Sequence, residues 1–182
     1  IFHGANTDPA KKYLRRVMLM AKSATVPINL VLCDYLLYYP FIDESIAGSE
    51  QALENTVSLP RYSDGAGVQM MAIVVAAQVG GQTFQVNYTN SDGVSGRTSK
   101  TAIMSTTSVT GTVLTTQGAA LNTSGPFLGL QNGDTGVRSI EGVTINGEDV
   151  GLFSLVLVKP LALATVRGLD APVEVDYLRN AG

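Results

Sequence analysis

Two neighbouring stretches of the chain have the hydrophobic patterns of β-strands. Residues 68–79 are almost wholly apolar, while residues 83–88 alternate between apolar and polar side chains. An unbroken apolar run is typical of a strand covered on both faces, and strict alternation is typical of a strand with one exposed face. Gly80 and Gly81 lie between them and can take the positive φ angles of a two-residue turn. The pattern predicts a β-hairpin; the alternative for residues 68–79 is a buried helix, since methionine and alanine are good helix formers.

The N-terminal region is predicted to begin with a helix. A threonine and an aspartate stand just before Pro9, where they can cap free amide groups, and proline is tolerated in a first helical turn. Apolar residues then recur at helical spacing with basic residues between them, which predicts a short amphipathic helix over residues 9–21. Residues 28–39 follow as an apolar run, either a strand or a buried turn of helix, and Pro40 is expected to end it.

The second half of the chain has the pattern of several short strands. Segments rich in β-branched residues alternate with turn-forming glycine, proline and asparagine, which indicates an antiparallel sandwich or barrel. The predicted strands cover residues 101–105, 108–115, 136–140, 143–145, 151–158, 161–166 and 170–179. Residues 151–158 are the most apolar and should be central in a sheet. We expect a mainly-β chain: an antiparallel, jelly-roll-like β-sandwich with a short N-terminal helix or arm.

Length and composition fit one domain, or one domain with an appended arm. The chain has 182 residues, of which 45% are hydrophobic, so it can bury a sizeable core. Only 15% are charged, below the usual quarter or so, which suits an extracellular or particle-bound β protein better than a cytosolic enzyme. We expect residues 1–60 to form the arm and an acidic connecting segment, packed on a sandwich body of residues 61–182.

The charges are unevenly distributed along the chain. The net charge is −3, so a global footprint for nucleic-acid binding is absent. Five of the twelve lysines and arginines nevertheless lie between Lys11 and Lys22, and acidic residues dominate from there to Asp64. One interpretation is a solvated helical face followed by an acidic loop. The other is a basic arm that docks on an acidic surface, which could belong to a neighbouring copy.

Aromatic residues gather between the basic and acidic segments. Tyr38, Tyr39 and Phe41 surround a proline, and tyrosine can bury its ring while its hydroxyl stays free to bond. Such a cluster is common at the edge of a core and also at interfaces. The candidate interface residues are therefore these three aromatics and the cations Lys11, Lys12, Arg15 and Arg16.

The sequence contains no catalytic constellation. His3 is the sole histidine and Cys33 the sole cysteine, so catalytic triads and histidine- or cysteine-based metal sites have no second member. Cys33 follows an apolar run and is expected to be a small buried residue. Asp43–Glu44 and Glu148–Asp149 are adjacent carboxylate pairs, which we interpret as solvated loop charge. We expect no enzyme activity, cofactor, bound metal, nucleic acid or membrane partner; no apolar run is long enough for a membrane-spanning helix.

Four short phrases of the sequence resemble a known class of protein. They occupy residues 60–68, 88–98, 125–128 and 133–140, and read PRYSDGAGV, YTNSDGVSGRT, GPFL and GDTGVRSI. They resemble virion structural proteins of tailed bacteriophages, of the kind that decorate or cement a head. The likeness runs across most of residues 35–180 and consists of a similar overall sequence character and recurring short phrases.

The resemblance implies a fold, a location and partners. Such a protein is β-rich, sits on the outside of the capsid lattice, binds the major capsid protein and often forms a homotrimer. The function that it implies is reinforcement of the lattice as a decoration or cement protein. The alternative is a tail or adsorption component that binds host glycan or another virion protein.

Overall fold

The computed structural model describes residues 14–22, 26–54, 57–104, 107–114 and 125–176. Within these ranges the chain forms strands and no helix, and the strand pairs are antiparallel, so the predicted mainly-β sandwich-like architecture is confirmed. The strands are β1 (Arg16–Leu19), β2 (Ile28–Asp43), β3 (Glu50–Ala52), β4 (Gln69–Val79), β5 (Thr83–Asn90), β6 (Arg97–Thr98), β7 (Ala102–Ile103), β8 (Thr107–Ser108), β9 (Val113–Leu114), β10 (Val137–Ile145), β11 (Val150–Val166) and β12 (Val173–Asp176).

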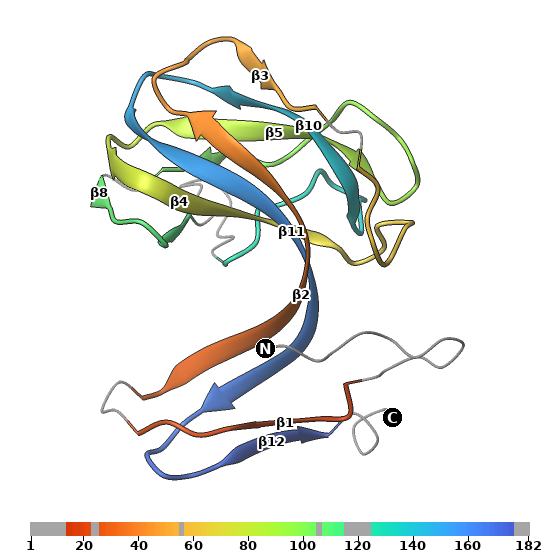
Figure 1. Cartoon of the computed structure of the whole chain (residues 1–182), viewed down its shortest axis with the longest axis vertical. Coiled ribbons are helices and arrows are strands. Elements are labelled where there is room, and N and C mark those ends of the chain that lie inside the picture. The colour runs from red at the N-terminus through yellow and green to blue at the C-terminus, as the bar shows by residue number, and fades with distance from the viewer. Residues whose placement is uncertain (1–13, 23–25, 55–56, 105–106, 115–124, 177–182) are drawn as a thin grey trace. The chain divides into compact units, whose positions relative to one another are not determined.

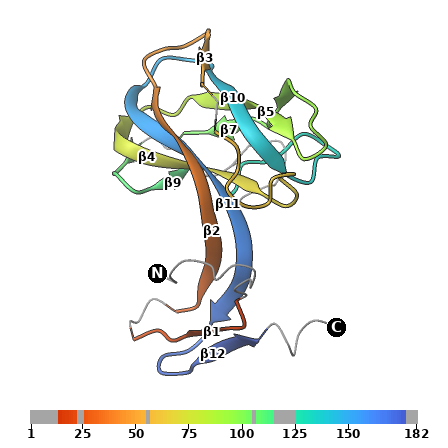
Figure 2. The same ribbon diagram turned by 45° about the vertical axis from the view of Figure 1, so that its right-hand side comes forward.

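The chain divides into two compact units. Unit 1 comprises Ile1–Cys33 and Pro160–Gly182, and unit 2 comprises Asp34–Lys159. The long strands β2 and β11 are neighbours in one sheet, and both views show them side by side (Figure 1; Figure 2). This division differs from the expected ranges of 1–60 and 61–182. Residues 34–60 belong with the sandwich because they supply the second half of β2 and all of β3 to its sheets.

Two five-stranded sheets build unit 2. One has the order β3-β10-β5-β6, with β7 also paired to β5, and the other has the order β2-β11-β4-β8, with β9 also paired to β4 (Figure 1). Alternate side chains of β5 and β11 are fully buried, and the rings of Phe84 and Phe153 meet at a centroid distance of 4.9 Å. The hydrophobic core therefore lies between the two sheets.

The predicted hairpin at Gly80 and Gly81 is wrong, although both of its strands form where expected. β4 pairs with β11, β8 and β9, whereas β5 pairs with β10, β6 and β7, so the two strands belong to different sheets. The glycines carry the chain from one sheet to the other. Asp149 holds this crossing: its Oδ2 accepts hydrogen bonds from the amides of Gly81 (3.0 Å) and Gln82 (2.9 Å). The helical alternative for residues 68–79 is also wrong.

The predicted N-terminal helix is wrong over its described part. Residues 16–19 form β1, whose partner is β12, in the register Arg16↔Asp176 to Leu19↔Val173. A short amphipathic segment fits helical spacing and strand alternation about equally well, so a partner strand decides between them. Here β12 supplies that partner from the other end of the chain. Residues 9–13 of the predicted helix lie outside the described residues.

Prolines do not end the long strands as predicted. Pro40 lies inside β2 and Pro160 inside β11, so the segments expected at 151–158 and 161–166 form one strand. The paired residues of β11 and β4 end at Val158. Pro160 lies beyond this pairing, so its missing amide hydrogen removes no hydrogen bond to β4. β11 lies between β2 and β4, which confirms the central position predicted for residues 151–158.

Candidate functional site

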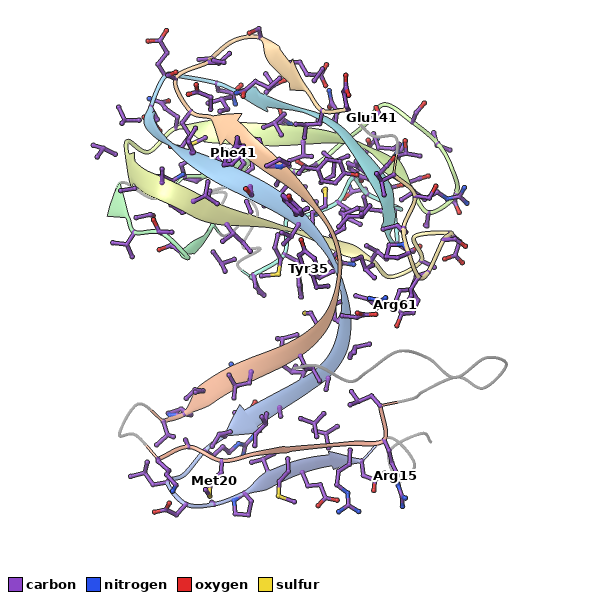
Figure 3. All side chains as sticks on the ribbon, in the orientation of Figure 1. Arg15, Met20, Tyr35, Phe41, Arg61 and Glu141 are labelled. Atoms are coloured by element: carbon purple, nitrogen blue, oxygen red, sulfur yellow. The ribbon has the colours of Figure 1, made fainter. Side chains whose placement is uncertain are left out.

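The exposed aromatic side chains of β2 are the most prominent apolar feature of unit 2. Tyr35, Tyr38 and Phe41 are 54%, 60% and 69% exposed, and we call these three residues the aromatic strip (Tyr35 and Phe41 are labelled in Figure 3). Tyr39, between them, is only 5% exposed, and its hydroxyl accepts a hydrogen bond from the amide of Ile140. Of the predicted interface aromatics, Tyr38 and Phe41 are thus exposed and Tyr39 belongs to the core.

The backbone explains part of the three-residue spacing between the exposed aromatics of β2. Strict strand alternation would place residues three positions apart on opposite faces. Phe41 has a φ angle of 60°, in the left-handed region that few non-glycine residues adopt, and this irregularity shifts the alternation near the end of β2. Sequence reasoning missed Tyr35 because it stands outside the dense run of aromatics, although it is an aromatic on the same predicted strand.

Hydrogen bonds fix the strand on both sides of the aromatic strip. Arg61 binds the carboxylate of Asp34 through Nε (2.7 Å) and Nη2 (2.6 Å), and its Nη2 also donates to the carbonyl of Tyr35. At the other end, the side chain of Gln51 accepts from the amide of Asp43 (2.9 Å) and donates to its carbonyl (2.7 Å). β2 is an edge strand, so these contacts both hold the strip in place and occupy backbone groups that would otherwise be open.

The predicted basic residues that the structure describes belong to unit 1, and the predicted aromatics belong to unit 2. Arg15 and Arg16 are exposed residues of unit 1. Arg16 pairs with Glu174 (3.2 Å) and Asp176 (3.8 Å) on the partner strand β12. Arg15 makes no ion pair with any described residue (Figure 3). Lys11 and Lys12 lie outside the described residues.

A buried carboxylate organises the loops that carry two of the four phrases. Asp134 accepts hydrogen bonds from Arg97 at both oxygens (3.0 Å each), from the hydroxyl of Tyr88 (2.6 Å) and from the side chain of Asn90 (2.8 Å). Its side chain is almost fully buried. The Arg97 guanidinium and these hydrogen bonds outweigh burial and lower the pKa of Asp134 to about 2. We call these four residues the Asp134 network.

The remaining parts of the phrases also have structural roles. Ala66 and Gly136 form an isolated β-bridge, and a side chain on Gly136 would overlap the carbonyl of Gly65. Arg138 donates to the backbone carbonyls of Asp64 and Ser91 (3.1 Å each from Nε). The residues of these phrases therefore join three loops of unit 2. The sequence drew attention to these residues but did not reveal this structural role.

One buried carboxyl group contradicts the sequence interpretation. Glu44 is fully buried, and Gln78 donates a hydrogen bond from Nε2 to its Oε1. Its second oxygen and Oε1 of Gln78 have no partner among the described residues. Burial raises the pKa of Glu44, and the nearby carboxylates of Asp149 and Asp43 raise it further, against the effect of Gln78. A neutral carboxyl fits this environment because it brings a donor where an ionised one brings only acceptors.

Neighbouring carboxylates therefore have different surroundings. Glu44 and Asp149 are buried, whereas Glu148 is exposed and Asp43 is half-buried, so the prediction of solvated loop charge is wrong for the first two. Cys33 is half-buried instead of fully buried, and burial raises the pKa of its thiol.

The described ranges contain no cluster of metal-ligating side chains. Across them, no three side chains of histidine, cysteine, aspartate or glutamate are grouped so that they could hold a metal ion. No helix of the described chain is long and apolar enough to cross a membrane. A shallow, open depression is lined by Thr98, Ser99, Lys100, Gln131 and Asn132.

Comparison with known proteins adds no relative: no family model, curated protein or solved structure matches this chain. The surfaces described above are consequently the basis for any functional argument.

Proposed function

We propose that this chain is a non-enzymatic structural protein of a tailed-bacteriophage virion, which binds the outside of the capsid lattice in many copies and reinforces it. The observation that carries the proposal is the aromatic strip on a fixed edge strand. Phrases that resemble decoration proteins give the proposal its class, and a mainly-β sandwich is the fold that such a protein would have. The major capsid protein and further copies of the chain are the proposed partners, with a homotrimer as the proposed oligomer.

The size of the aromatic strip indicates how it would be used. An aromatic side chain buries about 150–250 Å² in full, so the exposed parts of Tyr35, Tyr38 and Phe41 amount to roughly 300–400 Å² by the same scale. A stable interface buries about 800 Å² per partner. The strip therefore supplies the apolar centre of a contact and needs further surface around it. Many simultaneous contacts on a lattice would compensate for modest affinity at each one.

The proposed mechanism is mechanical. A subunit that contacts two neighbouring lattice proteins must be detached before those proteins can separate, so its binding free energy adds to the work of opening the lattice. Rigid support favours this role, because little conformational entropy is lost when a surface that is already fixed is buried. Arg61 and Gln51 provide that support on the two sides of the strip.

Binding to capsids tests the proposal. Purified chain is mixed with capsids that lack it, and the bound amount is measured after sedimentation. We expect saturable binding at a fixed number of copies per capsid, and capsids that open at a higher temperature. Tyr38→Ser with Phe41→Ser should weaken binding, whereas Val109→Ser, which removes an equally exposed apolar side chain outside the strip, should not. Absence of capsid binding, or antibody labelling confined to tails, would refute the proposal.

A tail or adsorption protein that binds host glycan is the second candidate. The same exposed tyrosines favour it, since aromatic faces can stack on apolar faces of sugar rings. Binding to a glycan array that is lost in Tyr35→Ser and Tyr38→Ser variants would support this candidate over the first. An array without binding would exclude the glycans that it displays.

A further inference from the structure

Unit 1 has little apolar interior of its own. Every residue of the main core cluster belongs to unit 2. The buried hydrophobic side chains in the described part of unit 1 are Ala162, Ala164 and Val166, whereas larger ones such as Met18 (60%) and Leu163 (65%) are exposed. A two-stranded ribbon such as β1–β12 is marginally stable in water by itself. Further burial against a partner would stabilise this unit.

The exposed side of β1 has a definite composition. Arg16 and Met18 of β1 and Met20 and Lys22 just beyond its end are alternate residues, and all are exposed; we call them the β1 stripe (Met20 is labelled in Figure 3). Alternate residues of an extended chain share one side. The stripe thus places two methionines between two cations. Methionine sulfur makes favourable contacts with aromatic rings, and cationic side chains bind their faces. Arg16 is already paired with Glu174 and Asp176, so Lys22 is the cation that the stripe offers to a ring.

The two units carry opposite net charge. Residues 1–33 and 160–182 contain seven lysines and arginines against four acids, which gives unit 1 a net charge of +3. Residues 34–159 contain five cations against eleven acids, which gives unit 2 a net charge of −6. Surfaces of opposite charge attract during encounter and fix the orientation of the complex.

Ion pairing inside unit 2 leaves its net charge acidic, because the pairs Arg61–Asp34 and Arg97–Asp134 each remove one cation and one acid. Four of its five cations are held within the unit: Arg61 by Asp34, Arg97 by Asp134, and Arg138 and Lys159 by backbone carbonyls. Asp43, two residues from Phe41, accepts two hydrogen bonds from Ser45, which lower its pKa and keep it charged. The last residue of the aromatic strip is thus followed, two positions later in the sequence, by a charged carboxylate.

We propose that the β1 stripe of one molecule binds the aromatic strip of a second molecule of this chain. Methionines of the stripe would pack on the aromatic rings, and Lys22 would lie near Asp43 or over a ring. The two surfaces differ, so the contact is heterologous and repeats from copy to copy until a ring closes. This inference rests on the proposed function and assigns the aromatic strip to the contact between copies on the capsid. Strip variants would then weaken capsid binding because unjoined copies lose the gain of many simultaneous contacts.

Two complementary variants of the full chain test the contact. The donor variant carries Met20→Glu and Lys22→Glu, and the acceptor variant carries Tyr38→Lys and Phe41→Lys. All four positions are exposed, so both variants should fold, which circular dichroism and thermal unfolding check. Sedimentation measures association of each variant alone and of their equimolar mixture.

The expected result is distinctive. Wild-type chain should associate, and each variant alone should do so at least tenfold more weakly. The mixture should form heterodimers, because the acceptor variant keeps an intact stripe and the donor variant an intact strip. Raising the salt from 0.1 M to 1 M, which shortens the screening length from about 10 Å to about 3 Å, should weaken wild-type association.

Three results would overturn the inference: a wild-type chain that stays monomeric, an acceptor variant that still associates alone, or a mixture that forms no heterodimer. Capsid sedimentation separates this inference from the proposed function. Wild-type oligomers that form as described but bind no capsid would refute the function and leave the contact between copies intact. Capsid binding by a chain that is monomeric throughout would refute the contact alone.

Discussion

Replacing Asp134 by asparagine removes the charge at the centre of the Asp134 network while keeping the size of the side chain. The guanidinium of Arg97 then loses the counter-charge that it contacts at 3.0 Å through both Nε and Nη2. The amide also presents a donor toward groups that already donate, namely the Tyr88 hydroxyl and the Asn90 side chain. We expect the folded state to lose stability and the two loops to separate more readily.

The lowered pKa of Asp134 sets the size of the expected loss in unfolding free energy. The pKa of Asp134 falls from 3.8 to about 2 on folding, and each pKa unit corresponds to about 1.4 kcal/mol. The charged form therefore contributes about 2–3 kcal/mol to the free energy of unfolding at neutral pH. Because the folded pKa is the lower one, this contribution is complete above pH 3.8 and is lost as the pH falls through about 2. For a chain of this length, a loss of about 2–3 kcal/mol lowers Tm by about 5–10 °C.

Urea unfolding at pH 7, followed by circular dichroism, measures the loss in Asp134→Asn. Asp92→Asn is the matched control: it lies in the neighbouring loop, is exposed, and should change stability by no more than about 0.5 kcal/mol. Repeating the comparison at lower pH should shrink the difference between wild type and Asp134→Asn as the pH approaches 2. A loss at pH 7 no larger than that of the Asp92→Asn control, or one that is unchanged between pH 7 and pH 2.5, would refute the reasoning.

Three further substitutions test other parts of the structure. Glu44→Gln should resemble wild type at pH 4 and be the more stable protein at pH 8. The folded pKa of Glu44 is raised, so the stability that its neutral form contributes is complete below the unfolded value of 4.5 and is lost as pH rises through the folded value. A wild type that is more stable than Glu44→Gln at pH 8 would contradict this. Phe41→Gly should keep or raise the unfolding free energy, because it relieves a φ of 60° at an exposed site, yet weaken association between copies in sedimentation; unchanged association would count against the aromatic strip as an interface. Gly136→Ala should cost about 2 kcal/mol or more in urea unfolding, because the added methyl overlaps Gly65, whereas Gly125→Ala has open space and should be nearly neutral; equal effects would argue against the close approach.

Alternation of side chains along the chain predicted which segments are strands better than it predicted their partners. β4 and β5 have the expected extents, but alternation says only that one face is buried, and both strands can cover the same core from opposite sheets. For the same reason two glycines could be assigned to a turn but not to a crossing between sheets. β1 was missed because its partner strand comes from the opposite end of the sequence, where no local pattern points to it.

The candidate surface was predictable only in part. The grouping of Tyr38, Tyr39 and Phe41 in the sequence drew attention to them. It could not tell the buried Tyr39 from its exposed neighbours, because the buried positions of β2 do not follow strict alternation. Buried carboxyl groups such as Glu44 have no sequence signature either. Their environment comes from β4 and β11, which are distant in the chain.

The close approach of Gly65 to Gly136 has a consequence for how such chains change over evolutionary time. Any side chain at Gly136 would collide with backbone, so drift at this point requires the two loops to move together. Exposed positions on β2 carry no such constraint and are free to adapt to a new neighbour. We therefore expect distant descendants of this chain to keep the glycine-rich phrases while their contact surfaces diverge, so that a shared phrase would report common architecture between proteins with different partners.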